Sequence, residues 1–219
     1  MSSLLPPEFL FRYTVSAKHR PGLPRRGKKL LNLPEEYRLP SLAGLAGRTD
    51  FGEIRIAWNE RGVGIGVRVT GKSHPPVSDP ESLGETDGLR IWIDTRCTQS
   101  VHRAGRFCHQ FEFLPVGGGD DGMQPVSALW PVARANEDSP PYDSDLLPIL
   151  SEINDEGYTL EAWLPADSLH GFDPAQQPRM GFSYALHDAE LGLQCLSLGP
   201  EFPFPSDPSL WCTLELAAE

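Results

Sequence analysis

The chain has 219 residues, of which 22 are proline and 21 are glycine, and its formal net charge is −11 at pH 7. This length is usual for a single all-β domain and is sufficient to bury a core without a metal or a disulfide. The acidic balance excludes nucleic acid and anionic membrane as main partners, because phosphate binding needs a net basic surface. No segment has the apolar core of a signal peptide or approaches the ~20 apolar residues of a membrane span. We therefore expect a cytoplasmic protein.

Residues 1–35 are basic and rich in proline and glycine. Between Arg12 and Lys29 there are seven Lys and Arg residues and no acidic residue. The interspersed prolines and glycines oppose helix formation. We therefore predict an N-terminal arm that is solvated or lies on the acidic body, with a contact to another acidic partner as the alternative.

Apolar and polar residues alternate repeatedly from residue 54 to residue 216, a pattern typical of half-buried strands. In the first such segment Ile54, Ile56 and Trp58 share one face, and the alternation resumes after a Glu-Arg-Gly turn. The pattern predicts a hairpin over 53–71 and further strands at 88–95, 107–114, 157–165, 180–188 and 210–216.

The middle of the chain differs from the segments on either side. Residues 115–145 are full of Gly, Pro and Asp and show no sustained period, so we predict a long irregular loop with one short strand around Val126 to Trp130. Long irregular segments of this kind often carry function. Many short strands with little helix predict one all-β domain over 1–219, an antiparallel two-sheet β-sandwich.

Four pieces of the sequence, in this order, resemble the family-9 carbohydrate-binding modules and their DOMON-like relatives. The first is the hairpin IRIAWNERGVGIGVRVTG, and the second is TDGLRIWIDTR, which resembles a signature strand with Asp87 and Asp94 at its acidic positions. The third is GYTLEAWLP, with Glu161 at an acidic position, and the fourth is MGFSYALHDAE followed by PSLWCTLEL. The resemblance implies a β-sandwich that binds sugar without catalysis, sometimes with structural calcium.

Three tryptophans are candidate platforms for a sugar ring. Trp92 and Trp163 lie on the face of their strands opposite the aliphatic residues, each beside a charged residue, and Trp130 lies in the irregular middle segment. We predict that these tryptophans stack on the sugar. The alternative is that the N-terminal arm or the middle loop covers them.

Arginine and histidine are crowded around the second of these pieces. Guanidinium groups bind carboxylates and sulfates in a bidentate manner. We therefore predict that an acidic or sulfated sugar is bound by Arg90, Arg96, Arg103 and His102. The alternative is that these arginines form ion pairs with acidic residues of 137–145.

No cofactor is required by any motif, although calcium is compatible with the aspartates. Calcium takes six to eight oxygen ligands, and the weak candidates, which no calcium-loop spacing connects, are Asp87, Asp94, Asp120 and Asp121. Cys97 and Cys108 flank the Arg/His segment, and we expect free thiols there.

The sequence contains no Gly-x-Ser-x-Gly, no His-Glu-x-x-His and no phosphate-binding glycine loop. We therefore predict a non-catalytic, carbohydrate-binding protein. One alternative is an intracellular protein-interaction or structural β-sandwich without a sugar site. Another is a glycoside hydrolase-like enzyme that uses Asp94 or Glu161, because carboxylate pairs are set by the fold.

Overall fold

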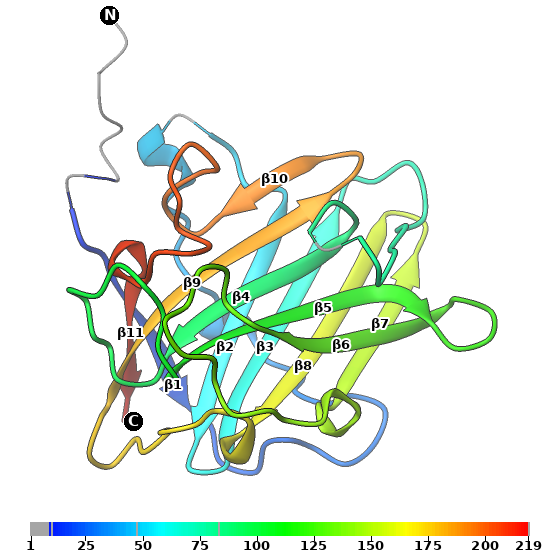
Figure 1. Ribbon diagram of the computed structural model, residues 1–219. Helices are drawn as coiled ribbons and strands as arrows, with labels where there is room; N and C mark the ends of the chain where they lie inside the picture. Colours follow the sequence, from blue (N-terminus) through cyan, green and yellow to red (C-terminus); the bar gives the residue numbers. More distant parts are fainter. Residues whose placement is uncertain (1–8, 10, 47, 83, 219) are drawn as a thin grey trace, which may run out of the picture.

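The computed structural model describes residues 9, 11–46, 48–82 and 84–218. Its strands form one hydrogen-bonded sheet (Figure 1). The strands are β1 (Thr14–His19), β2 (Gly52–Asn59), β3 (Gly62–Thr70), β4 (Gly88–Asp94), β5 (Cys108–Gly118), β6 (Gln124–Trp130), β7 (Ile149–Asn154), β8 (Gly157–Pro165), β9 (Arg179–Asp188), β10 (Gly192–Cys195) and β11 (Cys212–Ala217).

Helix is confined, in residues 11–46, 48–82 and 84–218, to five short 3-10 segments. They are η1 (Glu35–Tyr37), η2 (Ala43–Ala46), η3 (Ser144–Leu146), η4 (Ala166–Ser168) and η5 (Pro208–Leu210). Across these same ranges, no helix has the length and apolar character needed to cross a membrane. The all-β class with little helix is therefore confirmed.

The pairing of the strands differs from the predicted antiparallel two-sheet sandwich. The order is β6-β5-β4-β9-β11-β1-β2-β3-β8-β7, with β10 paired to β9. β1 runs parallel to both β11 and β2, and all other pairs are antiparallel. The sheet is therefore mixed and continuous, because β1 joins the two halves that would otherwise be separate sheets.

The connecting strand β1 lies inside the segment that we predicted to be an extended arm. Val15 and Ala17 are buried and alternate with exposed neighbours, which is the pattern of a strand with one face on the core. The surrounding basic residues and prolines hide this short alternation in the sequence.

The sheet curls until it is nearly a barrel. Edge strand β7 comes to lie beside β5 and β6 without pairing to them, and the Ser127 hydroxyl on β6 donates to the Leu147 carbonyl (3.3 Å) just before β7. Figure 1 shows β4, β5, β6 and β9 as one layer in front of β2, β3 and β8.

The inward-facing side chains of both layers form the main core. It includes Ile56, Ile65, Ile91 and Phe111, all without exposed area. Each such side chain stabilises the fold by about 1.5–3 kcal/mol relative to exposure. The outward-facing side chains of β4, β5 and β6 do not contribute to this main core, and some of them, including Trp92, pack in a second buried cluster.

The middle segment is more regular than predicted. β5 extends to Gly118 and forms a hairpin with β6, which confirms the short strand expected near Trp130. Residues 131–143, between β6 and η3, contain no strand or helix.

Candidate ligand-binding site

The register of β4, β5 and β6 brings three of the predicted residues together on one outer face. Trp92 lies opposite Gln110, which lies opposite Trp130. In the next outward-facing row Arg90 lies opposite Glu112. We call the set Arg90, Trp92, Gln110, Glu112 and Trp130 the β4–β6 face.

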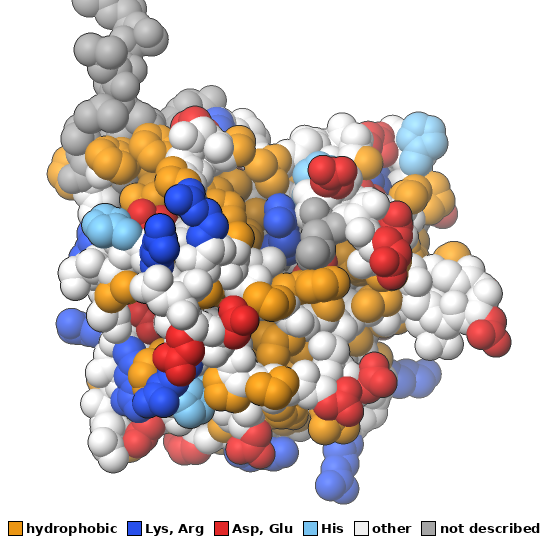
Figure 2. All heavy atoms as spheres, in the orientation of Figure 1, with side chains coloured by type: hydrophobic (Ala, Val, Ile, Leu, Met, Phe, Trp, Pro, Cys, Tyr) orange, Lys and Arg blue, Asp and Glu red, His pale blue; other side chains and the backbone are white. Residues whose placement is uncertain are grey.

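Figure 2 shows the molecule from the side on which β5 and β6 lie in front. Hydrophobic side chains are interspersed there with acidic and basic ones, and the Lys and Arg side chains do not form one continuous patch. A mixed surface of this kind suits a polar ligand with apolar faces better than a polyanion.

Trp92 is not the exposed platform that we predicted. Its side chain has no exposed area, and Phe204 packs edge-on against the indole with the ring centroids 5.3 Å apart. The indole Nε1 donates to Gln110 Oε1 at 2.9 Å. The alternation along β4 correctly places Trp92 off the main core, but the segment before β11 covers it.

The Arg90 guanidinium lies over the buried Trp92 ring, with its Cζ atom 5.5 Å from the ring centroid. Burial lowers the pKa of Arg90 and the charge of Glu112 raises it. Within the part of the chain that the structure describes, the guanidinium makes no hydrogen bond and no ion pair shorter than 4 Å. Its donors are therefore oriented by an aromatic ring but not used.

Glu112 is buried, and the Gly84 N–H donates to its Oε1 atom at 3.0 Å. Burial raises the pKa of this carboxyl, while the Gly84 N–H, Arg90 and the Trp130 indole lower it. The Nε1 atom of the half-buried Trp130 is buried close to the Glu112 carboxyl, although it makes no hydrogen bond of good geometry there. The β4–β6 face thus holds an unused guanidinium beside a carboxylate and an indole N–H that lie close to each other.

Trp163 lies on the other layer. It is buried on the outer side of β8 beneath Leu23, Leu30 and Leu31 of the N-terminal segment. The Glu161 carboxylate, two residues before it, accepts the N–H groups of Leu30 (2.7 Å), Leu31 (3.0 Å) and Asn32 (2.7 Å). Trp163 is therefore covered by the N-terminal segment, which was the alternative to its prediction as an exposed platform.

Arg96, His102 and Arg103 lie in the exposed connection between β4 and β5. The guanidiniums of Arg96 and Arg106 lie over the Phe107 ring, 4.7 and 5.0 Å from its centroid, and His102 Nδ1 contacts Asp207 Oδ2 at 3.1 Å. In the described ranges, no ion pair joins any of these arginines to residues 137–145. That alternative is wrong, and Arg96 is stacked on an aromatic ring instead.

The four aspartates named as calcium candidates lie apart. Asp94 accepts backbone N–H groups of Arg96 (2.9 Å) and Thr98 (2.5 Å), and Asp120 and Asp121 are exposed in the turn between β5 and β6. Asp87 is paired with the Lys72 ammonium. No group of three or more His, Cys, Asp or Glu side chains in the described segments is arranged to hold a metal, and all four cysteines are free thiols.

The residues missing from our prediction are Gln110, Glu112 and Gly84. The sequence carries a signal for the first two, because Gln110 and Glu112 alternate with Phe111 and Phe113 and must face away from the core. Gly84 gives no such signal, since its role follows from a loop that returns to β5.

Comparison with known proteins identifies the class of fold. No protein-family model matches the sequence, and no curated protein matches it. The fold is that of the family-9 carbohydrate-binding modules, as the four sequence pieces predicted.

Two of the matching structures are of a family-9 module from Caldicellulosiruptor kristjanssonii, in complex with cellotriose and with glucose. Both have a TM-score of 0.60, at 11% and 10% identity, and cover 94% of this chain and 94% and 96% of theirs. A protein from Bacteroides uniformis ATCC 8492, to which carbohydrate binding is ascribed, matches with a TM-score of 0.55 at 12% identity over 94% of this chain and all of its own. These are likenesses of fold.

Proposed function

We propose that this protein is a non-catalytic carbohydrate-binding module whose sugar site is the β4–β6 face. The observation that carries the proposal is the Arg90 guanidinium, which makes no hydrogen bond to a described residue and lies beside the Glu112 carboxylate and the Trp130 indole N–H. A partly buried polar group without a partner is costly. Sugar hydroxyls both donate and accept, so they match a site with two donors and one acceptor.

The aromatic residues have different roles in this proposal. Trp92 is covered, so it positions Arg90 by a cation–π contact, which is worth about 0.5–2 kcal/mol. The half-buried Trp130 offers ring surface for stacking beside the polar groups. The fold likeness to sugar-bound modules supports a carbohydrate as the ligand class.

We place the recognition of an acidic or sulfated sugar outside the immediate β4–β6 face. Glu112 disfavours an anion beside Arg90, whereas Arg96 and Arg106 have exposed guanidiniums with no ion pair to a described residue. β4 ends at Asp94, roughly 13 Å along the strand from Arg90, and Arg96 lies in the turn beyond it. Only an extended acidic glycan would therefore contact both Arg90 and Arg96. His102 and Arg103 lie in the same connection between β4 and β5 as Arg96.

One observation favours the second function, a protein-interaction or structural β-sandwich. Both Trp92 and Trp163 are covered by the chain itself, as expected if an aromatic sugar platform had been lost. The hydrolase alternative has weaker support. Asp94 and Glu161 point outward from different layers and both accept backbone N–H groups, unlike the facing carboxylates of glycosidases.

A glycan array with neutral, acidic and sulfated sugars tests the proposal. Arg90→Gln and Glu112→Gln should each weaken binding at least tenfold without unfolding the protein. Arg68→Gln is the matched control, because Arg68 is exposed on β3, away from the β4–β6 face, and has no hydrogen bond or ion pair to a described residue. If binding survives both test substitutions, the sugar site lies elsewhere on the protein. If the folded wild type binds no glycan on the array, the protein-interaction function is favoured.

The same array separates the acidic-sugar part of the proposal. The double substitution Arg96→Gln and Arg106→Gln should weaken binding to acidic and sulfated glycans only. If binding to neutral glycans is weakened equally, the two arginines support the fold and do not recognise the charge of the glycan.

A further inference from the structure

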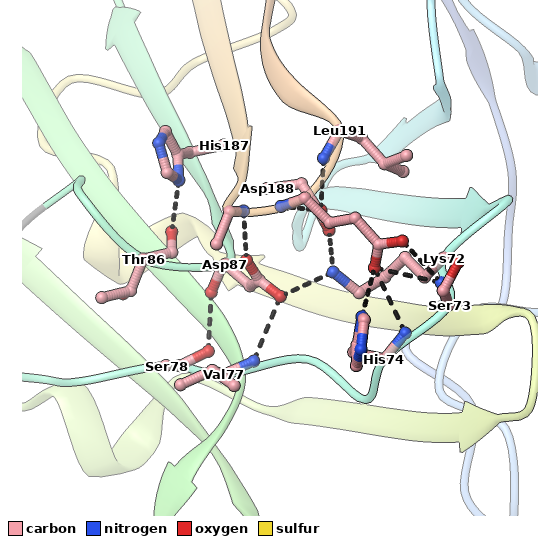
Figure 3. Close-up of polar contacts among 12 residues, drawn as sticks. Lys72, Ser73, His74, Val77, Ser78, Thr86, Asp87, His187, Asp188 and Leu191 are labelled. Atoms are coloured by element: carbon pink, nitrogen blue, oxygen red, sulfur yellow. Dashed lines mark hydrogen bonds and ion pairs between the residues drawn. The ribbon is translucent and has the colours of Figure 1, made fainter.

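The Lys72 side chain is buried between two aspartates. It follows β3, and only 2% of its side chain is exposed, against 1% for Asp87 and 0% for Asp188. Its Nζ atom donates to Asp87 Oδ2 at 2.9 Å and to Asp188 Oδ2 at 2.6 Å (Figure 3). One ammonium therefore bridges two carboxylates from the ends of neighbouring strands β4 and β9.

The remaining carboxylate oxygens are held by the backbone. Asp87 Oδ1 accepts the N–H group of Ala189 (2.7 Å), while Oδ2, which also binds the Lys72 ammonium, accepts that of Val77 (3.1 Å). Asp188 Oδ1 accepts those of residues 190 (3.0 Å) and 191 (2.9 Å) in the turn that leads to β10. The pair of carboxylates is thus fixed by the loops around it, and only the two Oδ2 atoms point to a shared centre.

A third buried oxygen is contributed by β8. The Tyr158 hydroxyl is buried, and no described residue makes a hydrogen bond to it. Tyr158 pairs with Val69 near the end of β3, and the Lys72 N–H donates to the Glu156 carbonyl (3.0 Å), so Tyr158 lies at the same end of the sheet as Lys72. Burial and then the charges of Asp188 and Asp87 raise the pKa of the phenol. Two buried carboxylates without a cation would cost several kcal/mol each.

We infer that Asp87 and Asp188 form a cation site that the chain fills with its own Lys72 ammonium. Calcium needs six to eight oxygens, and the ammonium already stands between the two oxygens that would bind it. The residues present therefore do not fit the calcium that we considered at Asp87. Removal of the ammonium would leave two buried carboxylates without a cation, and a divalent cation would neutralise them.

The site ties together two segments that flank the β4–β6 face. Besides the ion pairs, Glu190 accepts the N–H groups of Ser73 and His74, and the Ser78 hydroxyl donates to the Asp87 carbonyl (2.7 Å). The segment that these contacts hold, residues 71–82 and 84–87, includes Gly84, whose N–H donates to Glu112. This link to the sugar site rests on the proposed function, whereas the cation site itself does not.

The test compares full-length wild type with Lys72→Ala by thermal unfolding in excess EDTA and in millimolar calcium, and by calcium titration calorimetry. Loss of the ammonium should lower the Tm by roughly 6–20 °C. Calcium should restore part of that loss and bind Lys72→Ala in one equivalent, while the wild-type Tm stays unchanged. Lys29→Ala, which removes an exposed ion pair with Glu152, is the control and should show neither effect.

Two results would overturn the inference. One is a folded Lys72→Ala protein that neither binds calcium nor gains stability from it. The other is a wild-type Tm that rises with calcium and loses this rise in Asp87→Asn. If Lys72→Ala does not fold in EDTA, calcium should restore the folding of this variant or of the milder Lys72→Gln. If calcium restores the folding of neither variant, the inference is also overturned.

Discussion

Arg90 and Glu112 lie directly opposite each other on β4 and β5, yet they form no ion pair, and Gly84 contacts both of them. The Gly84 N–H donates to Glu112 Oε1 at 3.0 Å. The Arg90 guanidinium occupies the place where a Gly84 side chain would start, since a Cβ there would lie 2.0 Å from Arg90 Cζ. The glycine thus satisfies one Glu112 oxygen and leaves room for the guanidinium.

We expect Gly84→Ala to destabilise the protein and to displace Arg90. Gly84 has φ +68°, which costs a residue with a side chain about 1–3 kcal/mol, and the methyl group would collide with the guanidinium. Gly122→Ala is the control, because Gly122 has φ +69° and nothing within 4 Å of its Cβ position. Urea unfolding should show the larger loss for Gly84→Ala, and equal losses would mean that Arg90 moves aside freely.

Phe204→Ala should uncover Trp92 and cost about 3–5 kcal/mol. Phe204 is buried and packs on a tryptophan that has no exposed area. Iodide should therefore quench more of the tryptophan fluorescence in the variant. Phe202→Ala is a matched control, since Phe202 is half-buried and stacks on the exposed Phe9; equal quenching in the two variants would contradict the covering role of Phe204.

Glu161→Ala should loosen the N-terminal segment that covers Trp163. The substitution removes the acceptor of three backbone N–H groups, for which we expect a loss of about 2–3 kcal/mol. Limited trypsin digestion should cut faster after Arg25 and Arg26. Glu152→Ala removes only an exposed ion pair and should change stability by less than about 1 kcal/mol, so similar digestion of both variants would be evidence against this role.

His109 should make the protein sensitive to mild acid. Burial lowers its pKa from 6.5 to about 4, so the unfolded chain takes up the proton first as the pH falls. The wild type should therefore lose stability between pH 6.5 and about 4, by about 3 kcal/mol in total relative to His109→Gln. Urea unfolding across this range measures the difference, and the exposed His102→Gln should retain the wild-type slope.

The strands were largely predictable because their alternation is local. The hairpin of β2 and β3 and the strands β4, β5, β8, β9 and β11 follow from one face of apolar residues at every second position. β1 was not recognised, since Val15 and Ala17 are too few apolar residues to outweigh the basic neighbours. Its parallel pairing to β2 and β11 is a property of the whole fold.

The site was only partly predictable for a related reason. Alternation showed that Trp92 and Trp163 leave the main core, but it does not reveal which segment packs on them. Phe204 and Leu31 are 112 and 132 residues from these tryptophans. The Lys72 ammonium was equally hidden, because nothing local indicates that a lysine after β3 reaches aspartates at β4 and β9.

The parallel pairing of β1 with β11 has a consequence for biosynthesis. β1 leaves the ribosome well before β11, because nine strands lie between them in the sequence, yet Val15 pairs with Leu214 in the middle of the sheet. Trp58 Nε1 also donates to the Ala217 carbonyl at 3.1 Å. A nascent chain that lacks β11 has unpaired edges on both β1 and β9, so we expect the sheet to close only after β11 has been synthesised and a truncation before residue 212 to be prone to aggregation.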